Sequence, residues 1–479
     1  MKECKNLTFE ECELFILRQA IDNLEKKIKK NKINSPEIKN IIEIVESFLK
    51  KKKVMCYGGT AINNLLPKKE QFYDKSIEFP DYDFFSKTPL KHAKELADLY
   101  FKKGYENTEA KSGIHTGTFK VYVNFIPVAD ISYFPEKIFD KVWEKRKTIK
   151  EISYLPPNFL RLLMYLELSR PKGHIQRWEK VFKRLTKLNR VYPIKTKKCN
   201  FFKNSSIKNS KKNLYNKIIK NTIIENKGVF FGSLANENFF KINKKLSKKY
   251  KSFKINYYDV LHKNPRTLVE RIKINLEKKK IQNIKIKKIK GLGEIISEHY
   301  KILINNKIVC FIYKPLGCHS YNIIKKYGKE IRIATIDTQL MYYLFFLYMK
   351  KPYFDENKIF CIAEYLFRIQ KQNRLRQNGL LKRFNYKCIG QQETFESLRL
   401  KKYNLHKTIK KGAPEWDFYF LRYYPNEIKS KKAGKIKKKS KTNKNSKTKK
   451  NYNTIKSKKS KKSKKKKKIF KGWLGNIGY

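Results

Sequence analysis

The sequence predicts an α/β (α+β) protein made of two lobes that share one order of elements. Short apolar strands alternate with helix-forming segments between residues 53 and 133, and such alternation is typical of helices layered on a sheet. An apolar strand followed by a glycine turn and a helix occurs twice, at residues 54–60 and 229–235. At 479 residues the chain is also too long for one compact core, so two or three domains are expected.

Composition and local pattern divide the chain into five parts. Residues 1–50 are an N-terminal helical segment, in which Ser35-Pro36 is a favourable helix start. Residues 51–194 carry the first strand-turn-helix pattern, with a helix over 90–102, and 195–226 are a polar linker. Residues 227–427 carry the second pattern, and 428–479 are a lysine-rich tail.

A glycine turn after the first strand predicts a phosphate site. Gly58 and Gly59 allow a tight turn with close backbone approach. Thr60 follows where a helix over 61–66 would begin, so its hydroxyl and backbone N–H would point out of the helix N-terminus. Such a terminus favours phosphate through its dipole and its free donors. An ordinary strand-turn-helix connection is the alternative interpretation.

Three carboxylates on two later strands predict a metal site. Asp81 and Asp83 lie among aromatic residues at i and i+2, which places both on one face of a strand. Two carboxylates there repel each other, and a hard divalent cation removes the conflict. Asp130 lies inside the apolar run 128–132, where an acid is costly unless it is paired or metal-bound. The alternatives are a solvated Asp-Tyr-Asp loop and a strand-end cap.

The helical stretch that follows supplies cations that could contact a nucleotide or a nucleic acid, and the sequence does not choose among them. They are Arg161, Arg170, Arg177, Lys180 and Arg184.

The second pattern looks like a degenerate copy of the first. Gly232-Ser233 follows an apolar strand and precedes a helix, but no Asp-x-Asp follows, and Asp259 stands alone. Strands are expected at 307–313 and 331–336, and residues 371–427 are expected to pack on this second lobe. An unrelated α/β domain is the alternative.

The charge of the chain favours a polyanionic partner. The formal charge is +71, of which the acid-free segment 429–471 supplies 23, leaving +48 on the rest. Neutralising phosphates releases counterions, so nucleic acid is the natural partner, with salt-dependent affinity. Part of the lysine content also fits an A+T-rich coding sequence. The tail cannot bury a core, and we expect it to be disordered and to act as a nonspecific RNA arm rather than as a targeting patch.

The cysteines and apolar runs favour an intracellular protein. Eight cysteines show no zinc-ligand spacing, so reduced thiols are expected. Met1 leads into a charged helix without the features of a signal peptide. The longest apolar run, 340–349, is too short to cross a bilayer, so no membrane partner is expected.

The order Gly58-Gly59-Thr60, Asp81-Tyr82-Asp83 and Asp130 resembles the nucleotidyltransferase superfamily, which includes DNA polymerase β-like enzymes. The surrounding residues, in particular 57–64, 80–86, 117–120 and 127–131, are similar to the poly(A) polymerase catalytic subunits of giant viruses (mimivirus-like), with poxvirus enzymes as more distant relatives. The strong part of the resemblance covers residues 50–190. Residues 67–79 are an apparent insertion between the glycine turn and Asp81.

The resemblance implies a template-independent poly(A) polymerase with a catalytic nucleotidyltransferase lobe and a degenerate second lobe. Asp81, Asp83 and Asp130 would be catalytic and would bind two Mg²⁺ or Mn²⁺ ions. Gly58, Gly59 and Thr60 would hold the phosphates of ATP.

It further implies an RNA 3′ end as acceptor, a homodimer, and a place in the virion and the host cytoplasm (virus factory). The alternatives are a CCA-adding, oligoadenylate-type or small-acceptor enzyme, and a catalytically silent RNA-binding processivity subunit.

Overall fold

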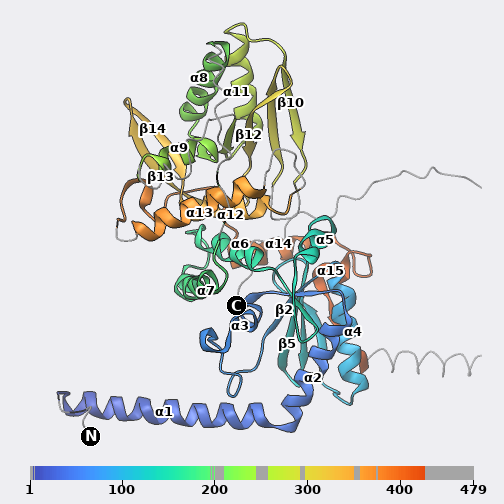
Figure 1. The fold of residues 1–479 in the computed structure, drawn as a ribbon. Helices are drawn as coiled ribbons and strands as arrows, with labels where there is room; N and C mark the ends of the chain where they lie inside the picture. Colours follow the sequence, from blue (N-terminus) through green and yellow to red (C-terminus); the bar gives the residue numbers. More distant parts are fainter. Residues whose placement is uncertain are drawn as a thin grey trace, which may run out of the picture.

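Two lobes, each built on an eight-stranded mixed sheet, make up the computed structural model (Figure 1). The structure describes residues 4, 6–194, 196, 199, 210–243, 257–291, 297–349, 356–373 and 376–426. The predicted α/β fold class is confirmed. The predicted tail, 428–479, lies outside the described residues.

The N-terminal helices are α1 (Phe9–Asn34) and α2 (Pro36–Lys51). Ser35 separates them and caps α2 as predicted, because its hydroxyl accepts from the N–H of Ile38 at 3.3 Å. The two helices differ in burial. α2 buries an apolar row from Ile38 to Leu49 against the first lobe, whereas α1, all of whose residues are described, buries none and extends beyond the sheet (Figure 1).

The first sheet has the strand order β16-β3-β4-β5-β2-β1-β7-β6. Its strands are β1 (Met55–Cys56), β2 (Tyr82–Ser86), β3 (Thr108–Ser112), β4 (Thr118–Val123), β5 (Ile126–Tyr133), β6 (Lys147–Ile149), β7 (Ile152–Tyr154) and β16 (Arg422–Tyr423). Its helices are α3 (Gly58–Leu65), α4 (Pro89–Lys102), α5 (Glu136–Glu144), α6 (Pro157–Leu168) and α7 (Trp178–Val191), with 3₁₀ turns at Lys68–Glu70 and Ile175–Arg177. The sequence pattern did not predict β3, the hairpin β6–β7 or β16.

The second sheet has the order β10-β11-β12-β9-β8-β14-β13-β15. Its strands are β8 (Val229–Phe231), β9 (Tyr258–Leu261), β10 (Ile284–Ile289), β11 (His299–Ile304), β12 (Lys307–Tyr313), β13 (His319–Lys326), β14 (Lys329–Ala334) and β15 (Cys388–Ile389). Its helices are α8 (Ser210–Glu225), α9 (Ser233–Phe240), α11 (Pro265–Glu277), α12 (Ile336–Phe346) and α13 (Glu356–Gln372), with a 3₁₀ turn at Gly379–Leu381.

The polar stretch predicted as a linker at 195–226 contains a helix of the second lobe, so the linker prediction is wrong for residues 210–225. α8 packs on α11 and β14. Ile219, Thr222 and Ile223 are buried at helical spacing, but the lysines and asparagines between them obscured that period.

The end of the described chain returns to the first lobe, which corrects the expectation that residues 371–427 pack on the second. β15 still belongs to the second sheet, but β16 pairs antiparallel with β3. α15 (Trp416–Phe420) packs on β3, and α14 (Phe395–Thr408) is tied to the first lobe because Lys402 donates to the Gly113 carbonyl at 3.1 Å. A two-residue strand has too short a period to be read from sequence, and its partner lies some 310 residues earlier.

The two sheets repeat one topology, which supports the interpretation of the second lobe as a copy of the first. In each lobe the first strand pairs antiparallel with the second (β1 with β2, β8 with β9), and the second pairs parallel with a later strand (β2 with β5, β9 with β12). That later strand pairs antiparallel with the strand before it, β4 in one lobe and β11 in the other. A further strand runs parallel to the first strand on its other side, β7 and β14 respectively.

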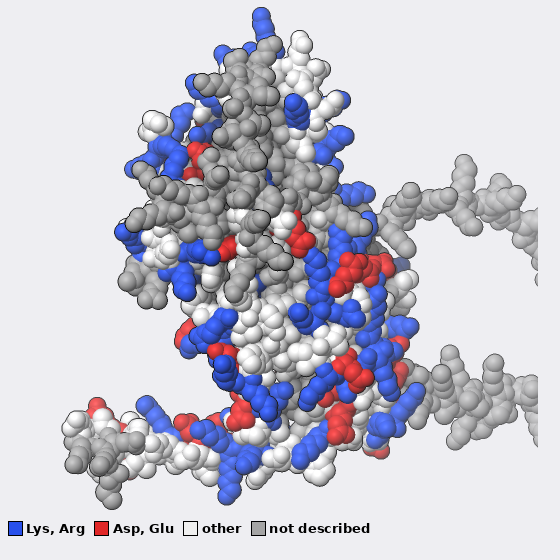
Figure 2. Space-filling model, in the orientation of Figure 1, with Lys and Arg blue, Asp and Glu red and all other residues white. Residues whose placement is uncertain are grey.

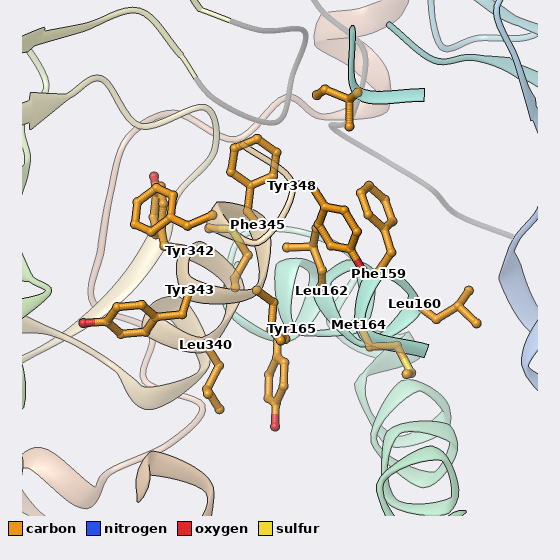
Figure 3. Packing of buried hydrophobic residues seen from close by; sticks show 14 of the residues in the cluster. Phe159, Leu160, Leu162, Met164, Tyr165, Leu340, Tyr342, Tyr343, Phe345 and Tyr348 are labelled. Atoms are coloured by element: carbon orange, nitrogen blue, oxygen red, sulfur yellow. The ribbon is translucent and has the colours of Figure 1, made fainter. Parts of the chain in front are cut away.

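Equivalent helices join the lobes. α6 follows β7 and α12 follows β14, and these two helices pack against each other. Figure 3 shows the contact, with Phe159, Leu162 and Tyr165 of α6 facing the side where α12 and Tyr348 lie. The Phe159 and Tyr348 rings meet at a centroid distance of 5.0 Å, and both are buried. The lobes therefore share one continuous apolar core.

Six of the eight cysteines form disulfides, so the expectation of reduced thiols is wrong for them. The pairs are Cys4–Cys12, Cys199–Cys361 and Cys318–Cys388, whereas Cys56 and Cys310 are free and buried. Two pairs join positions 162 and 70 residues apart, a proximity that spacing in sequence does not reveal. Among the described residues, the structure contains no helix with the length and apolarity needed to cross a bilayer.

Candidate functional site

The glycine turn forms the first turn of α3 rather than a loop before it. α3 begins at Gly58, three residues earlier than predicted, with Tyr57 as its N-cap residue. Gly58 has a φ of +73°, and a Cβ atom there would overlap Oδ2 of Asp83. Glycine is therefore required twice at this position, by the left-handed backbone and by the approach of the carboxylate.

Thr60 does not face outward as predicted. Its side chain is buried, and its hydroxyl donates to the backbone carbonyl of Asp81 at 2.7 Å. This hydrogen bond ties α3 to the residue that precedes β2. Thr60 therefore holds the glycine turn and the first carboxylate in register, and its hydroxyl is engaged by the protein.

The three predicted carboxylates come together on adjoining strands. Asp83 on β2 is the direct cross-strand partner of Asp130 on β5, in a parallel pairing. Asp81 lies two residues before Asp83, so alternation directs both side chains to the same face of the sheet. Asp83 is 9% exposed and Asp130 4%. The strand pairing therefore supports the predicted constellation.

Burial and mutual repulsion dominate the electrostatics of this cluster. Burial raises the pKa of Asp81, an effect that the nearby Lys120 and Lys180 oppose. Burial and then the charge of Asp81 raise the pKa of Asp83 and of Asp130 well above the usual range. The three groups therefore resist being ionised together unless positive charge is supplied.

Lys120 supplies part of that charge, and sequence reasoning missed it. Its ammonium lies 2.8 Å from Oδ2 of Asp130, its cross-strand partner on β5. Burial lowers the pKa of Lys120 to about 8, and the charges of Asp81 and Asp83 oppose that shift. The signal was present in β4, where Thr118, Lys120 and Tyr122 alternate with buried residues, but the register between β4 and β5 is not visible in one sequence.

The donor set fits a hard divalent cation in chemical kind. Three carboxylates offer only oxygen ligands, which Mg²⁺ and Mn²⁺ prefer, and their repulsion is the conflict that such a cation relieves. The described residues contain no group of three or more His, Cys, Asp or Glu arranged closely enough to hold a metal ion. The carboxylates are thus gathered on one face, with Lys120 beside one of them, and are not drawn into a closed cage.

The structure sorts the five cations that the sequence left open. Arg161 is fixed inside the first lobe, donating to Asn189 and to the carbonyl of Tyr192. Arg170 is buried against Gly317 of the second lobe.

Arg177, Lys180 and Arg184 lie on one face of the segment that forms α7, at i, i+3 and i+7. Of this row, Lys180 lowers the pKa of Asp81 and Arg177 that of Asp83, which places both cations within electrostatic reach of the carboxylates.

Two cavities flank the glycine turn. A cleft of about 940 Å³ is lined by Thr60, Tyr73 and Asp81 together with residues of α1 and α2. A smaller cavity of about 80 Å³ is lined by Gly58, Arg177, Arg184 and apolar residues of α6. Asp81 thus lines the larger cavity and Arg177 and Arg184 line the smaller one, whereas neither lining includes Asp83 or Asp130.

Basic side chains continue over the surface around these cavities. Figure 2 shows Lys and Arg over both lobes and along α1, with fewer Asp and Glu among them. This distribution agrees with the formal +48 that remains outside 429–471. The folded part of the molecule therefore offers a large polyanion a favourable surface.

Comparisons with known proteins agree on one family for the segment that carries the site. Residues 43–174 match the family model described as poly(A) polymerase catalytic subunit. A relative from Acanthamoeba polyphaga mimivirus is 34% identical over 175 residues, covering 35% of this chain and 29% of that protein. One from African swine fever virus (isolate Pig/Kenya/KEN-50/1950) is 33% identical over 172 residues, covering 35% and 36%. Both carry the name "Putative poly(A) polymerase catalytic subunit".

The match covers about a third of the length of these relatives. The whole chain matches a solved structure, the crystal structure of the Megavirus polyadenylate synthase, with a TM-score of 0.73 and 21% identity over 94% of this chain and 93% of that one. This likeness shows the fold. Together the matches confirm the resemblance predicted from the motifs.

Proposed function

We propose that this chain, residues 43–174 of which match the poly(A) polymerase catalytic subunit family, is a template-independent poly(A) polymerase. It would transfer AMP from ATP to the 3′ end of RNA. The 3′-oxygen bonds to the α-phosphorus, the bond from that phosphorus to the pyrophosphate breaks, and the hydroxyl proton passes to solvent. The observation that carries the proposal is the gathering of Asp83 on β2 and Asp130 on β5, with Asp81 just before β2, beside a glycine turn and within electrostatic reach of Arg177 and Lys180.

Asp81, Asp83 and Asp130 are the residues that would hold two Mg²⁺ or Mn²⁺ ions. When bound, such ions lower the pKa of the attacking hydroxyl and neutralise the triphosphate and the leaving pyrophosphate. The chain itself supplies positioning. The first turn of α3 at Gly58 and Gly59 presents free backbone donors to the phosphates, and Thr60 holds that turn beside Asp81. Positioning and charge stabilisation account for most of the catalysis in phosphoryl transfer.

The acceptor is proposed to be RNA because the folded part of the chain is strongly basic. A formal +48 outside the lysine-rich segment 429–471 would track a phosphate backbone. The same charge disfavours a small-molecule acceptor. A homodimer, and a location in the virion and the virus factory of the host cytoplasm, are further proposals that rest on the resemblance to viral proteins.

A primer-extension assay tests the function. The full chain is incubated with a short RNA primer, Mg²⁺ or Mn²⁺, and each nucleoside triphosphate separately. Long products with ATP alone, which need the primer, are expected. The double variant Asp81→Asn with Asp83→Asn should make none, while its RNA affinity and melting temperature show that it is folded. Undiminished ATP incorporation by this variant would contradict the proposal, and tight RNA binding without turnover in any metal would favour a silent binding protein.

A further inference from the structure

Residues 67–79, the apparent insertion, are anchored on both sides of the site. The buried Asn63 of α3 accepts from the backbone N–H groups of Phe72 at 2.8 Å and Tyr73 at 3.0 Å. Glu70 pairs with Arg190 of α7 at 2.8 Å. The segment therefore links α3 to α7 and presents its aromatic pair between them.

Tyr73 and Arg184 meet at the first turn of α3. Nη2 of Arg184 donates to Oη of Tyr73 at 2.5 Å. A Cβ atom at Gly59 would overlap that hydroxyl and would lie 2.9 Å from the same guanidinium nitrogen. Both side chains thus stand directly against the backbone that begins the helix, and a glycine at position 59 leaves the room they occupy.

Arg184 is a buried cation without a matching anion. Its side chain is 9% exposed, and its guanidinium lies 5.0 Å from the centroid of the Phe72 ring. Among the described residues no carboxylate lies within ion-pair distance of it, whereas Lys187 and Arg190 on the next turn both pair with Glu70. A buried charge is costly unless an opposite charge compensates it.

Glu167 and Glu78 lie within electrostatic reach of Arg184, but the Glu167 carboxylate already pairs with Arg177 at 3.0 Å. The other charged groups around Arg184 are positive. The N-terminus of α3 carries the positive end of the helix dipole, and Arg177 and Lys180 lower the pKa of Arg184 or are themselves shifted by it. Nη1 of Arg177 is buried and has no hydrogen-bond partner among the described residues. Arg177 is paired with Glu167, so the N-terminus of α3, Lys180 and Arg184 supply the positive potential that favours a multiply charged anion here.

The Tyr73 hydroxyl can donate a hydrogen bond to such an anion while it accepts one from Arg184. Burial raises the pKa of Tyr73, so its oxygen keeps the proton. While the oxygen accepts from Arg184, the proton can be donated to a phosphate oxygen. Tyr73 and Asp81 both line the 940 Å³ cleft, so a chain of phosphates there can reach from Asp81 to the hydroxyl of Tyr73, which contacts Arg184.

We propose that Arg184, held in place by Tyr73 of the inserted segment 67–79, binds the terminal phosphates of the nucleotide. The inference rests on the proposed function for the identity of the ligand as a nucleoside triphosphate. Arg184 is then a phosphate-binding residue, Tyr73 is its positioning residue, and Asn63 fixes the segment that carries Tyr73. Segment 67–79 thus contributes Tyr73 directly to the proposed phosphate site.

Direct binding of inorganic tripolyphosphate to the full chain, followed by isothermal titration calorimetry, tests this without requiring turnover. Replacing Arg184 by Gln removes charge-assisted hydrogen bonds, and we expect binding weakened roughly 10- to 100-fold. Arg184→Lys should recover part of the loss, because the charge remains but the fork does not. Tyr73→Phe keeps the ring and should weaken binding roughly 3- to 10-fold. Lys183→Gln is the matched control, since Lys183 lies on the same helix, is 70% exposed and pairs only with Glu179 among the described residues.

Steady-state kinetics with ATP and an RNA primer give the second readout. Arg184→Gln and Tyr73→Phe should raise the KM for ATP by similar factors and change the KM for RNA less than twofold. Equal tripolyphosphate affinity in Arg184→Gln and Lys183→Gln would overturn the inference even if poly(A) synthesis is intact. A wild-type chain that binds tripolyphosphate through Arg184 but makes no poly(A) would instead overturn the proposed function alone. Should Arg184→Gln fail to fold, the Arg184→Lys and Tyr73→Phe pair decides by the same criterion.

Discussion

The two lobes place different side chains on the same framework. Gly58, the first residue of α3, and Gly232, the N-cap residue of α9, both have φ near +70°. In each lobe a Cβ atom on the glycine would overlap an aspartate, Asp83 or Asp259. The strand pairing makes Tyr257 the counterpart of Asp81, two residues before the shared aspartate, and Phe311 the counterpart of Asp130.

Where the first lobe gathers carboxylates, the second packs an aromatic pair. The Tyr257 and Phe311 rings meet edge to face at a centroid distance of 5.4 Å. The glycine-aspartate contact is therefore common to both lobes and belongs to the fold, whereas Asp81 and Asp130 are particular to the lobe with the proposed chemistry. Asp83 belongs both to the glycine contact that the lobes share and to the carboxylate cluster of the first lobe.

The largest expected difference between the two lobes is at Asp130, whose counterpart in the second lobe is Phe311. We expect Asp130→Asn to lower kcat by roughly 1000-fold, since a metal ligand contributes several kcal/mol of transition-state stabilisation. The counterpart Phe311→Leu should leave kcat within about twofold, because it changes only packing in the second lobe. Primer extension under saturating ATP measures both. Comparable losses in the two variants would show that the second lobe takes part in the chemistry.

The sheet edges of the two lobes are protected differently, which predicts a large stability effect. β16 covers β3 in the first sheet, whereas β10, with the sequence Ile-Lys-Ile-Lys-Lys-Ile, pairs only with β11 among the described residues. Lysines of this kind guard an open edge.

Ending the chain after residue 414 should therefore destabilise the first lobe by about 3–5 kcal/mol, through lost ladder bonds and buried apolar area. Ending it after residue 426 keeps β16 and is the control. Urea unfolding followed by tryptophan fluorescence compares the two, and equal midpoints would refute the role of β16.

The packing of the first lobe against α14 predicts that folding stability falls in acid. Burial, and then the charge of His174, lower the pKa of His115 to about 4, and both rings contact Phe395. The unfolded chain binds this proton near pH 6.5 and the folded chain only near pH 4, so folding stability falls as pH drops between these values. The loss amounts to roughly 2–3 kcal/mol at pH 4. His115→Leu should flatten the melting temperature over that range relative to wild type. A parallel decline in both proteins would exclude His115 as the cause.

A smaller expected effect, on stability, distinguishes Asp83 from its counterpart Asp259. Metal-free Asp83→Asn should be more stable than wild type by about 1–2 kcal/mol, because it removes one of three mutually repelling carboxylates. Asp259→Asn should bring no such gain, since aromatic rings occupy the neighbouring positions. Melting temperatures in a chelating buffer measure the difference, and an equal gain in both variants would show that local burial, not repulsion, sets it.

Local patterns in the sequence predicted the features that depend on one or two strands. Alternation was enough to place Asp81 and Asp83 on one face, and the cost of an acid in an apolar run was enough to single out Asp130. Features that depend on strands distant in sequence were missed, because the pairing register cannot be read from one chain. Lys120 beside Asp130 and β16 beside β3 are of this kind.

Local competition between signals explains the other differences. Lysines and asparagines concealed the period of α8, and the two glycines suggested a loop where α3 already begins. The first two parts of the five-part division of the chain remain as predicted segments. A new boundary is needed at 210, where α8 of the second lobe begins, and at 395, where α14 returns the chain to the first lobe. The role of the inserted segment became visible only through the hydrogen bonds of Asn63 and Tyr73.

The return of the chain to β3 also determines the order in which the molecule can be completed during synthesis. The strands of the second lobe, 229–389, form a contiguous stretch, whereas the first sheet waits for β16 at Arg422–Tyr423. At roughly 5–20 residues per second, about 15–50 s separate the synthesis of β7 from that of β16. Throughout this interval the edge of β3 is open on the ribosome. The lobe that is made first is therefore the last to be closed.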